Sequence, residues 1–269
     1  MKKSTGNLIK NIRLNILKLT YKAKSSHIGS SLSIVEILAI LYNEILSISA
    51  QKKNFSHRDR FILSKGHAAL ALYCTLYEKN FITKNTLNSY GKENTILMGH
   101  VSHKVPGIEF STGSLGHGLP LAIGKSLNAK KYNKKWKIYA LLSDGELNEG
   151  SNWEGLMFAA HHNLDNLTII IDYNKMQSLD YVKKTIRLEP LKEKFKSFGC
   201  HVLDINGHNL LQIRKAFRKK IQNKPKIIIA NTIKGKGVSF MENNILWHYK
   251  SPDKFQLKKA LIEINKRYA

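Results

Sequence analysis

The chain is poor in the residues that mark secreted, metal-binding and membrane proteins. Its 269 residues include only two cysteines, Cys74 and Cys200, which match no metal or redox spacing. This usage favours a reducing compartment with both thiols free, so we expect a cytoplasmic protein. No apolar run approaches the length of a membrane span, and the basic N-terminus lacks the continuous apolar core of a secretory signal. We therefore expect no membrane partner.

Acidic residues are also scarce, because 19 Asp and Glu stand against 44 Lys and Arg, which gives a formal net charge of +25. A balance of this kind suggests nucleic-acid binding as one class of function. However, most of the excess is lysine, and it is scattered along the chain instead of being clustered with arginines and aromatic residues. We interpret it as a solvated lysine surface and expect no nucleic-acid partner.

Alternating apolar runs and helical patterns predict the fold class. The candidate strands are short, apolar and rich in β-branched residues. They span residues 60–63, 138–142, 167–171, 200–205 and 226–230. Strands that alternate with helices predict a three-layer α/β/α fold with a mainly parallel sheet. No domain boundary is visible, so residues 1–269 are expected to form a single domain.

Helix starts are indicated by polar residues at characteristic spacing. Ser33 with Glu36, and Ser151 with Glu154, have the form of capping boxes. The first box predicts a helix that runs to about Leu46, and the second a helix that runs to about residue 162. The second helix is long enough for a right-handed crossover between the strands on either side of it.

Polar residues follow two of the predicted strands where each strand ends. Asp144 and Gly145 come after the strand at 138–142, and Asn174 comes after the strand at 167–171. Neighbouring parallel strands end at the same edge of a sheet, and ligands bind at that edge. Carboxylate, amide and carbonyl oxygens suit Mg²⁺, which completes its coordination with water and phosphate oxygens. The pattern therefore predicts a metal and phosphate site, which the backbone at Gly145 can approach closely.

A long loop from about residue 90 to 118 has no clear periodicity and contains six glycines, which is typical of a functional loop. Five histidines stand at the ends of predicted elements, three of them directly beside glycine, where imidazole can bond phosphate and hydroxyl oxygens or relay protons. They are His27, His67, His100, His117 and His248. No His–Cys spacing indicates zinc.

The stretch from Ser143 to Asn174 resembles the thiamine diphosphate signature, which opens with Gly-Asp-Gly and closes with Asn. Here Ser143 replaces the first glycine. Further segments follow the order found in the amino-terminal half of transketolases, so that the resemblance covers nearly the whole chain. These segments are residues 26–29, 63–68, 99–100, 111–118, 234–237 and 241–248.

The resemblance implies a set of site residues and cofactors. Thiamine diphosphate would be bound together with Mg²⁺, or with Ca²⁺ or Mn²⁺ in its place. The metal would be held by Asp144, Asn174 and the carbonyl of Met176. The residues expected to bind the cofactor are His67, Gly113, Ser114, Leu115, Asp144, Gly145, Glu146 and Asn174.

The same resemblance implies residues for catalysis. His27, His100 and His248 would line the channel over the thiazolium and bond the sugar hydroxyls, and Glu149 matches a family glutamate near the subunit interface. Two departures affect these expectations. His117 stands where the family usually has Gln, and Tyr249 stands where many members have Gly.

In this family a glutamate that activates the cofactor lies on a pyrimidine-binding domain, which follows the part seen here. The chain therefore resembles the amino-terminal subunit of a split transketolase, inactive without a carboxy-terminal partner subunit in a hetero-oligomer such as a heterotetramer. The implied reaction is transfer of a two-carbon ketol unit from a ketose, expected to be phosphorylated, to an aldose. Alternatives are a subunit of another thiamine enzyme, of the deoxyxylulose-phosphate synthase or 2-oxo acid dehydrogenase type, or a degenerate scaffold.

Overall fold

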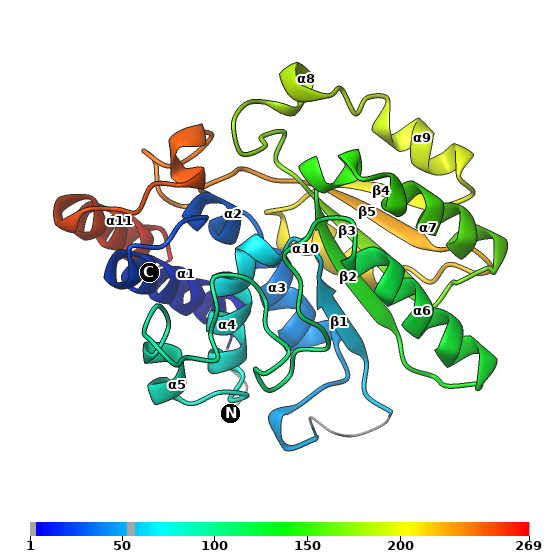
Figure 1. Ribbon diagram of the computed structural model, residues 1–269, viewed down its shortest axis with the longest axis horizontal. Coiled ribbons are helices and arrows are strands. Elements are labelled where there is room, and N and C mark those ends of the chain that lie inside the picture. Colours follow the sequence, from blue (N-terminus) through cyan, green and yellow to red (C-terminus); the bar gives the residue numbers. More distant parts are fainter. Residues whose placement is uncertain (1–3, 53–56, 269) are drawn as a thin grey trace.

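The computed structural model describes residues 4–52 and 57–268 (Figure 1). Within these ranges five strands form one sheet with the order β1-β2-β3-β5-β4, and each strand pairs in parallel with its neighbours. The strands are β1 (Arg60–Leu63), β2 (Ile138–Ser143), β3 (Leu167–Tyr173), β4 (His201–Asn206) and β5 (Lys226–Asn231). The predicted parallel sheet is therefore confirmed, and each predicted strand lies within one residue or two of its observed bounds.

Helices cover both faces of the sheet, which gives the three layers that the sequence predicts (Figure 1). One face carries α6 (Gly118–Lys131), α7 (Gly150–His161) and α9 (Leu191–Ser197). The other carries α1 (Thr5–Ala23), α3 (Val35–Ile40), α4 (Ala69–Glu78) and α10 (Leu210–Arg218). Successive strand residues point to opposite faces, so that Leu141 lies in one hydrophobic core and Leu142 in the other.

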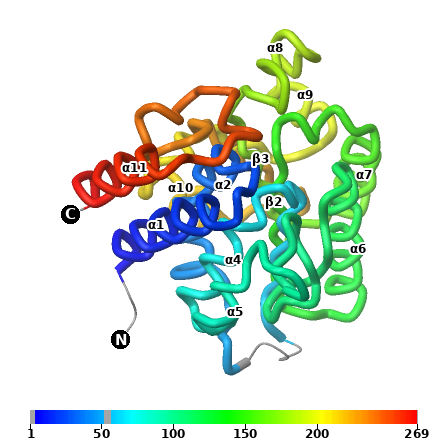
Figure 2. The backbone as a smooth tube through the Cα atoms, turned by 60° about the vertical axis from the view of Figure 1, so that its left-hand side comes forward, coloured from blue at the N-terminus to red at the C-terminus, as the bar shows by residue number. Residues whose placement is uncertain are grey.

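The first and last long helices lie side by side, although they come from opposite ends of the chain (Figure 2). Helix α1 packs against α11 (Lys254–Arg267), and the short helices α2 (Ile28–Leu32) and α5 (Lys84–Asn88) lie in the same layer. The short helix α8 (Val182–Thr185) lies away from them, and its Val182 belongs to the core on the other face of the sheet. None of the described helices is both long and apolar enough to cross a membrane. Cys74 and Cys200 are buried free thiols.

Both predicted capping boxes are wrong, because their serine hydroxyls bond to distant parts of the chain. The Ser33 hydroxyl donates to Asp172 Oδ2 at 2.7 Å, and α3 begins after Ile34. The Ser151 hydroxyl donates to the carbonyl of Gly116 at 2.8 Å, and α7 begins two residues earlier than predicted, with Glu149 as its N-cap. In each case the serine ties a helix start to a segment that approaches the carboxyl edge of the sheet.

Candidate functional site

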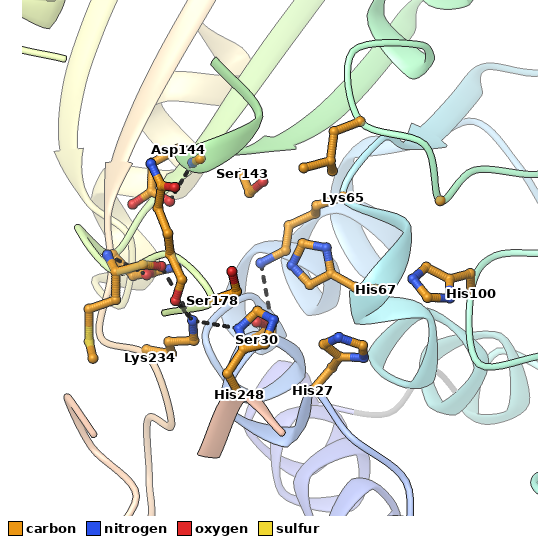
Figure 3. Close-up of a pocket in the computed structure, with 16 residues that line it drawn as sticks. His27, Ser30, Lys65, His67, His100, Ser143, Asp144, Ser178, Lys234 and His248 are labelled. Carbon is orange, nitrogen blue, oxygen red and sulfur yellow. Dashed lines mark hydrogen bonds between the residues drawn. The ribbon is translucent and has the colours of Figure 1, made fainter. Parts of the chain in front are cut away.

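The carboxyl ends of β2 and β3 meet at one edge of the sheet, as predicted. Ser143 pairs with Asp172 in the parallel register, so that Asp144 and Asn174 emerge beside each other. A pocket of about 220 Å³ opens at this point (Figure 3). Its lining comes from nearly every segment singled out in the sequence: His27, Ser30, Lys65, His67, His100, Gly113, Leu115, Ser143, Asp144, Gly145, Asn174, Met176, Gln177, Ser178, Lys234 and His248.

Asp144 is the buried carboxylate of this pocket, with only 1% of its surface exposed. Its two oxygens accept backbone N–H groups, from Gly145 at 2.8 Å and from Lys175 at 2.6 Å. Burial raises the pKa of Asp144 to about 7, and the neighbouring carboxylate of Asp172 contributes to this rise. A bound cation would hold such a group in its ionised form. Asp144 therefore has the environment of a cation ligand.

Two further oxygens in the pocket complete a set suited to a hard cation. The Asn174 amide donates to Asp172 Oδ2 at 3.1 Å, and its oxygen accepts the N–H of Met176 at 3.1 Å. The Met176 carbonyl faces Lys234. In the part of the chain that the structure describes, no three His, Cys, Asp or Glu residues gather into a metal cluster. One carboxylate, one amide and one carbonyl suit an ion that takes its remaining ligands from water and phosphate.

Two buried lysines that the sequence did not predict as site residues line the pocket, although both lie in segments that resemble the transketolase family. Lys65 is fully buried, forms an ion pair with Asp172, and donates to the Ser30 carbonyl at 3.2 Å. Lys234 is 1% exposed, and burial together with Lys65 lowers its pKa to about 8. Both lysines line the pocket together with Asp144 (Figure 3). The pocket is therefore suited to an anion such as a diphosphate.

Four histidines from four separate segments meet on the side of the pocket away from Asp144 (Figure 3). The His27 ring centroid lies 4.9 Å from that of His248, 5.4 Å from that of His67 and 5.7 Å from that of His100. Burial lowers the pKa of His27 to about 4 and that of His248 to about 3, and it lowers the pKa of His67 well below its ordinary value. At neutral pH these three rings are uncharged. They can bond hydroxyl groups without repelling the nearby lysines.

The long glycine-rich loop contains no helix or strand between α5 and α6, as predicted. It reaches the pocket through Gly113 and Leu115. Gly116 adopts φ = 80°, a conformation that favours glycine, and a Cβ atom there would lie 2.7 Å from the Cβ of Glu149. This glycine lets the loop pass close to the start of α7.

Three residues expected at the site lie outside the pocket lining. Ser114 and Glu149 are exposed. Glu146 is fully buried, and its carboxylate accepts hydrogen bonds from the Ser64 hydroxyl and from the N–H groups of Gly116 and Ser143. In this structure Glu146 joins the ends of β1 and β2 to the glycine-rich loop.

The structure also gives the positions of the residues that depart from the family pattern. His117 is exposed and lies outside the pocket lining. Tyr249 is 57% exposed, and its ring lies 4.7 Å from that of His248. Ser143 ends β2 in ordinary strand conformation and is absent from the described residues with positive φ. A serine therefore fits at this point of the signature without strain.

Comparison with known proteins agrees with this geometry. Residues 4–257 match the family described as "Transketolase, thiamine diphosphate binding domain". The chain is 42% identical over 258 residues to a subunit of the apulose-4-phosphate transketolase of Actinobacillus succinogenes, covering 95% of this chain and 94% of that protein. It is 39% identical over 257 residues to the subunit of the same name from Phocaeicola vulgatus, covering 95% and 92%.

A solved structure shows the same fold. The transketolase of Campylobacter jejuni superposes with a TM-score of 0.89 at 29% identity, covering 97% of this chain and 42% of that chain. The family match, the subunit relatives and the shared fold agree with the pocket at the ends of β2 and β3. The chain belongs to the transketolase family and corresponds to its thiamine diphosphate-binding domain.

Proposed function

We propose that the chain is the diphosphate-binding subunit of a split transketolase and that, with a partner subunit, it transfers a two-carbon ketol unit from a phosphorylated ketose to an aldose. One observation carries this proposal: a single pocket combines an oxygen ligand set, two buried lysines and a group of histidines, three of them uncharged at neutral pH. The oxygens and lysines suit a metal–diphosphate group, and the histidines suit a polyhydroxylated sugar.

The residues present fit thiamine diphosphate with Mg²⁺. Asp144, Asn174 and the Met176 carbonyl would hold the metal, while Lys65 and Lys234 would balance the charge of the diphosphate. His67 would donate to a diphosphate oxygen. The backbone at Gly113 and Leu115 would contact the aminopyrimidine. When bound, thiamine diphosphate supplies the carbanion chemistry of ketol transfer, and the protein supplies position and proton transfer.

His27, His100 and His248 would act on the sugar. Because His27 and His248 are uncharged at neutral pH, each ring has one N–H donor and one nitrogen acceptor. Such rings can orient hydroxyl groups of a ketose and move a proton to or from a substrate oxygen. Tyr249, at the exposed end of the cluster, would contact the part of the substrate that lies farther from the cofactor.

The names of the relatives support a partner. Two proteins of nearly the same length are each named as one subunit of a transketolase, while the aligned region makes up 42% of the Campylobacter jejuni chain. We infer a carboxy-terminal subunit that carries the pyrimidine-binding half, within a cytoplasmic hetero-oligomer. The substrate named for these relatives, apulose 4-phosphate, favours a phosphorylated sugar here as well.

The test is an assay of the chain mixed with its candidate partner, encoded by the neighbouring reading frame, in the presence of thiamine diphosphate and Mg²⁺. Phosphorylated ketoses should be consumed only when an aldose acceptor is present, and the acceptor should gain two carbons. Decarboxylation of pyruvate or another 2-oxo acid without ketol transfer would instead support another thiamine enzyme. Absence of both activities, with the complex formed, would support a scaffold.

A further inference from the structure

The ammonium group of Lys234 has three hydrogen-bond acceptors and is almost completely buried. Its Nζ lies 2.9 Å from the Gln177 carbonyl, 3.3 Å from the Met176 carbonyl and 2.9 Å from Nδ1 of His248 (Figure 3). None of the carboxylates that the structure describes forms an ion pair with it. The side chain is therefore held by neutral acceptors, one of which is an imidazole nitrogen.

The backbone on either side of Lys234 is anchored independently. The N–H of Ile233 donates to Nε2 of His208 at 2.8 Å, and Nδ1 of His208 lies 3.1 Å from the buried Glu36 carboxylate. On the other side, the N–H of Gly235 donates to the Gly29 carbonyl at 3.0 Å. These bonds connect the Lys234 segment with α2 and α3, so the position of the ammonium is built into the fold.

We propose that Lys234 is a positioning residue that sets the tautomer of His248, with Nδ1 as the acceptor and the ring proton on Nε2. A lysine ammonium has three donors and no acceptor, and carbonyl oxygens only accept. The third N–H must then be donated to Nδ1, so this nitrogen carries no proton. A neutral imidazole keeps its single N–H on the other nitrogen.

This tautomer leaves the Nε2 proton of His248 available to a ligand in the pocket. The backbone of His248 is anchored as well, because its carbonyl accepts the N–H of His27 at 2.6 Å. Its Nε2 makes no hydrogen bond with any residue that the structure describes, and the ring lines the pocket. On the proposed function, His248 therefore presents an N–H donor to a sugar oxygen.

Lys226 offers a matched control. It is also buried, with 6% of its surface exposed, and its ammonium donates to the carbonyls of Ala216, Phe217 and Lys219 at 3.0, 2.8 and 2.9 Å. It stands at the opposite end of β5 from the site, and none of its three acceptors is a histidine. Lys226→Met removes an equivalent buried charge without touching His248.

The experiment uses the isolated chain without cofactor or partner, labelled with nitrogen-15 in its histidines. Long-range proton–nitrogen correlation spectra at pH 7 report which nitrogen of each ring carries the proton, and His248→Gln assigns the His248 signals. We expect the spectra to show that Nε2 of His248 carries the proton. We also expect the Nδ1 resonance to differ from that of an unprotonated nitrogen without a hydrogen bond, because Nδ1 accepts a bond from the ammonium. Lys234→Met should abolish that difference, and Lys226→Met should leave it unchanged.

A protonated Nδ1 in the native chain would overturn the proposal, and so would an unchanged Nδ1 resonance in Lys234→Met. The measurement on the native chain decides the tautomer even if that variant fails to fold. Because the isolated chain needs neither cofactor nor partner here, the result is independent of whether ketol transfer is ever detected.

Discussion

The backbone N–H of His27 donates a 2.6 Å hydrogen bond to the carbonyl of His248, which joins two segments from opposite ends of the chain. His27 also has φ = 69°, in the left-handed region that is uncommon for residues other than glycine. Its ring centroid lies between 4.9 and 5.7 Å from those of His67, His100 and His248. The backbone bond therefore holds His27 and His248 together, and the rings of His67 and His100 lie next to that of His27.

Replacing a channel histidine should separate sugar binding from cofactor binding. His27→Ala, His100→Ala or His248→Ala should each lower kcat/KM for the ketose donor by about tenfold or more, since each removes at least one hydrogen bond to the reacting sugar. Thiamine diphosphate affinity should change little. The control is His103→Ala, because His103 is exposed and bonds to Ser111 outside the pocket. Loss of cofactor binding with normal donor kinetics would contradict the assignment.

His67 should behave in the opposite way. Of the four pocket histidines, His67 is the nearest in sequence to Lys65, and both residues line the pocket. His67→Ala should weaken thiamine diphosphate binding by about tenfold, the effect of one lost hydrogen bond to a charged group, and leave the KM for the ketose nearly unchanged at saturating cofactor. Fluorescence titration with thiamine diphosphate measures the change. Unaltered affinity would show that His67 makes no contact with the cofactor.

Asp144→Ala should abolish metal-dependent cofactor binding, because the only carboxylate among the three proposed ligands is removed. Isothermal titration with thiamine diphosphate, with and without Mg²⁺, measures this effect. Asp165→Ala is the control, since Asp165 is partly exposed and pairs with Lys130. Chelation of the metal should weaken binding by the native protein in the same way. Full affinity in Asp144→Ala would place the metal elsewhere.

Lys65→Met should destabilise the fold, because it leaves the buried carboxylate of Asp172 without its cation. Both side chains of this ion pair are fully buried. Breaking a buried pair by removing one partner costs about 3–5 kcal/mol in the free energy of unfolding. Lys130→Met, which breaks the partly exposed pair with Asp165, should cost less than about 1 kcal/mol. Urea unfolding of both variants makes the comparison, and equal losses would contradict this account of the pair.

The lowered pKa values of His27 and His248 predict a pH dependence of stability. Their ordinary pKa is 6.5, and burial lowers it to about 4 for His27 and about 3 for His248. Between pH 6.5 and about 4 the unfolded chain binds protons that the folded chain does not, so stability falls as the pH is lowered through this window. Urea midpoints from pH 7 to pH 4 should fall less steeply in the His27→Gln/His248→Gln variant. Equal slopes would show that the rings titrate normally.

Sequence patterns predicted the elements and the edge where the site lies. The spacing and composition of the apolar residues were sufficient to predict the strands, because buried parallel strands are continuous apolar runs. The ends of two such strands placed Asp144 beside Asn174. The start of α10 is also local in origin, because the Asn209 side chain accepts N–H groups of that helix. These features depend on local sequence or on the regular geometry of the sheet.

The features that the sequence did not predict depend on tertiary contacts. Ser33 and Ser151 have the spacing of capping residues, but their hydroxyls find acceptors in distant segments. Glu146 is only two residues from Asp144, yet its carboxylate turns toward Ser64 and the glycine-rich loop. Lys234 was overlooked because nothing local distinguishes a buried lysine among so many surface ones. Its role emerges only when distant segments meet.

The most direct test of the account is ketol transfer by the purified chain alone and after addition of its partner, at saturating thiamine diphosphate and Mg²⁺. The pocket contains the groups proposed to hold the metal and the diphosphate, but the glutamate that activates the cofactor is expected on the partner. The account predicts no transfer above background from this chain alone, and restored transfer with tighter cofactor binding in the mixture. Robust transfer by this chain, in a preparation that mass spectrometry shows to contain no second polypeptide, would contradict it.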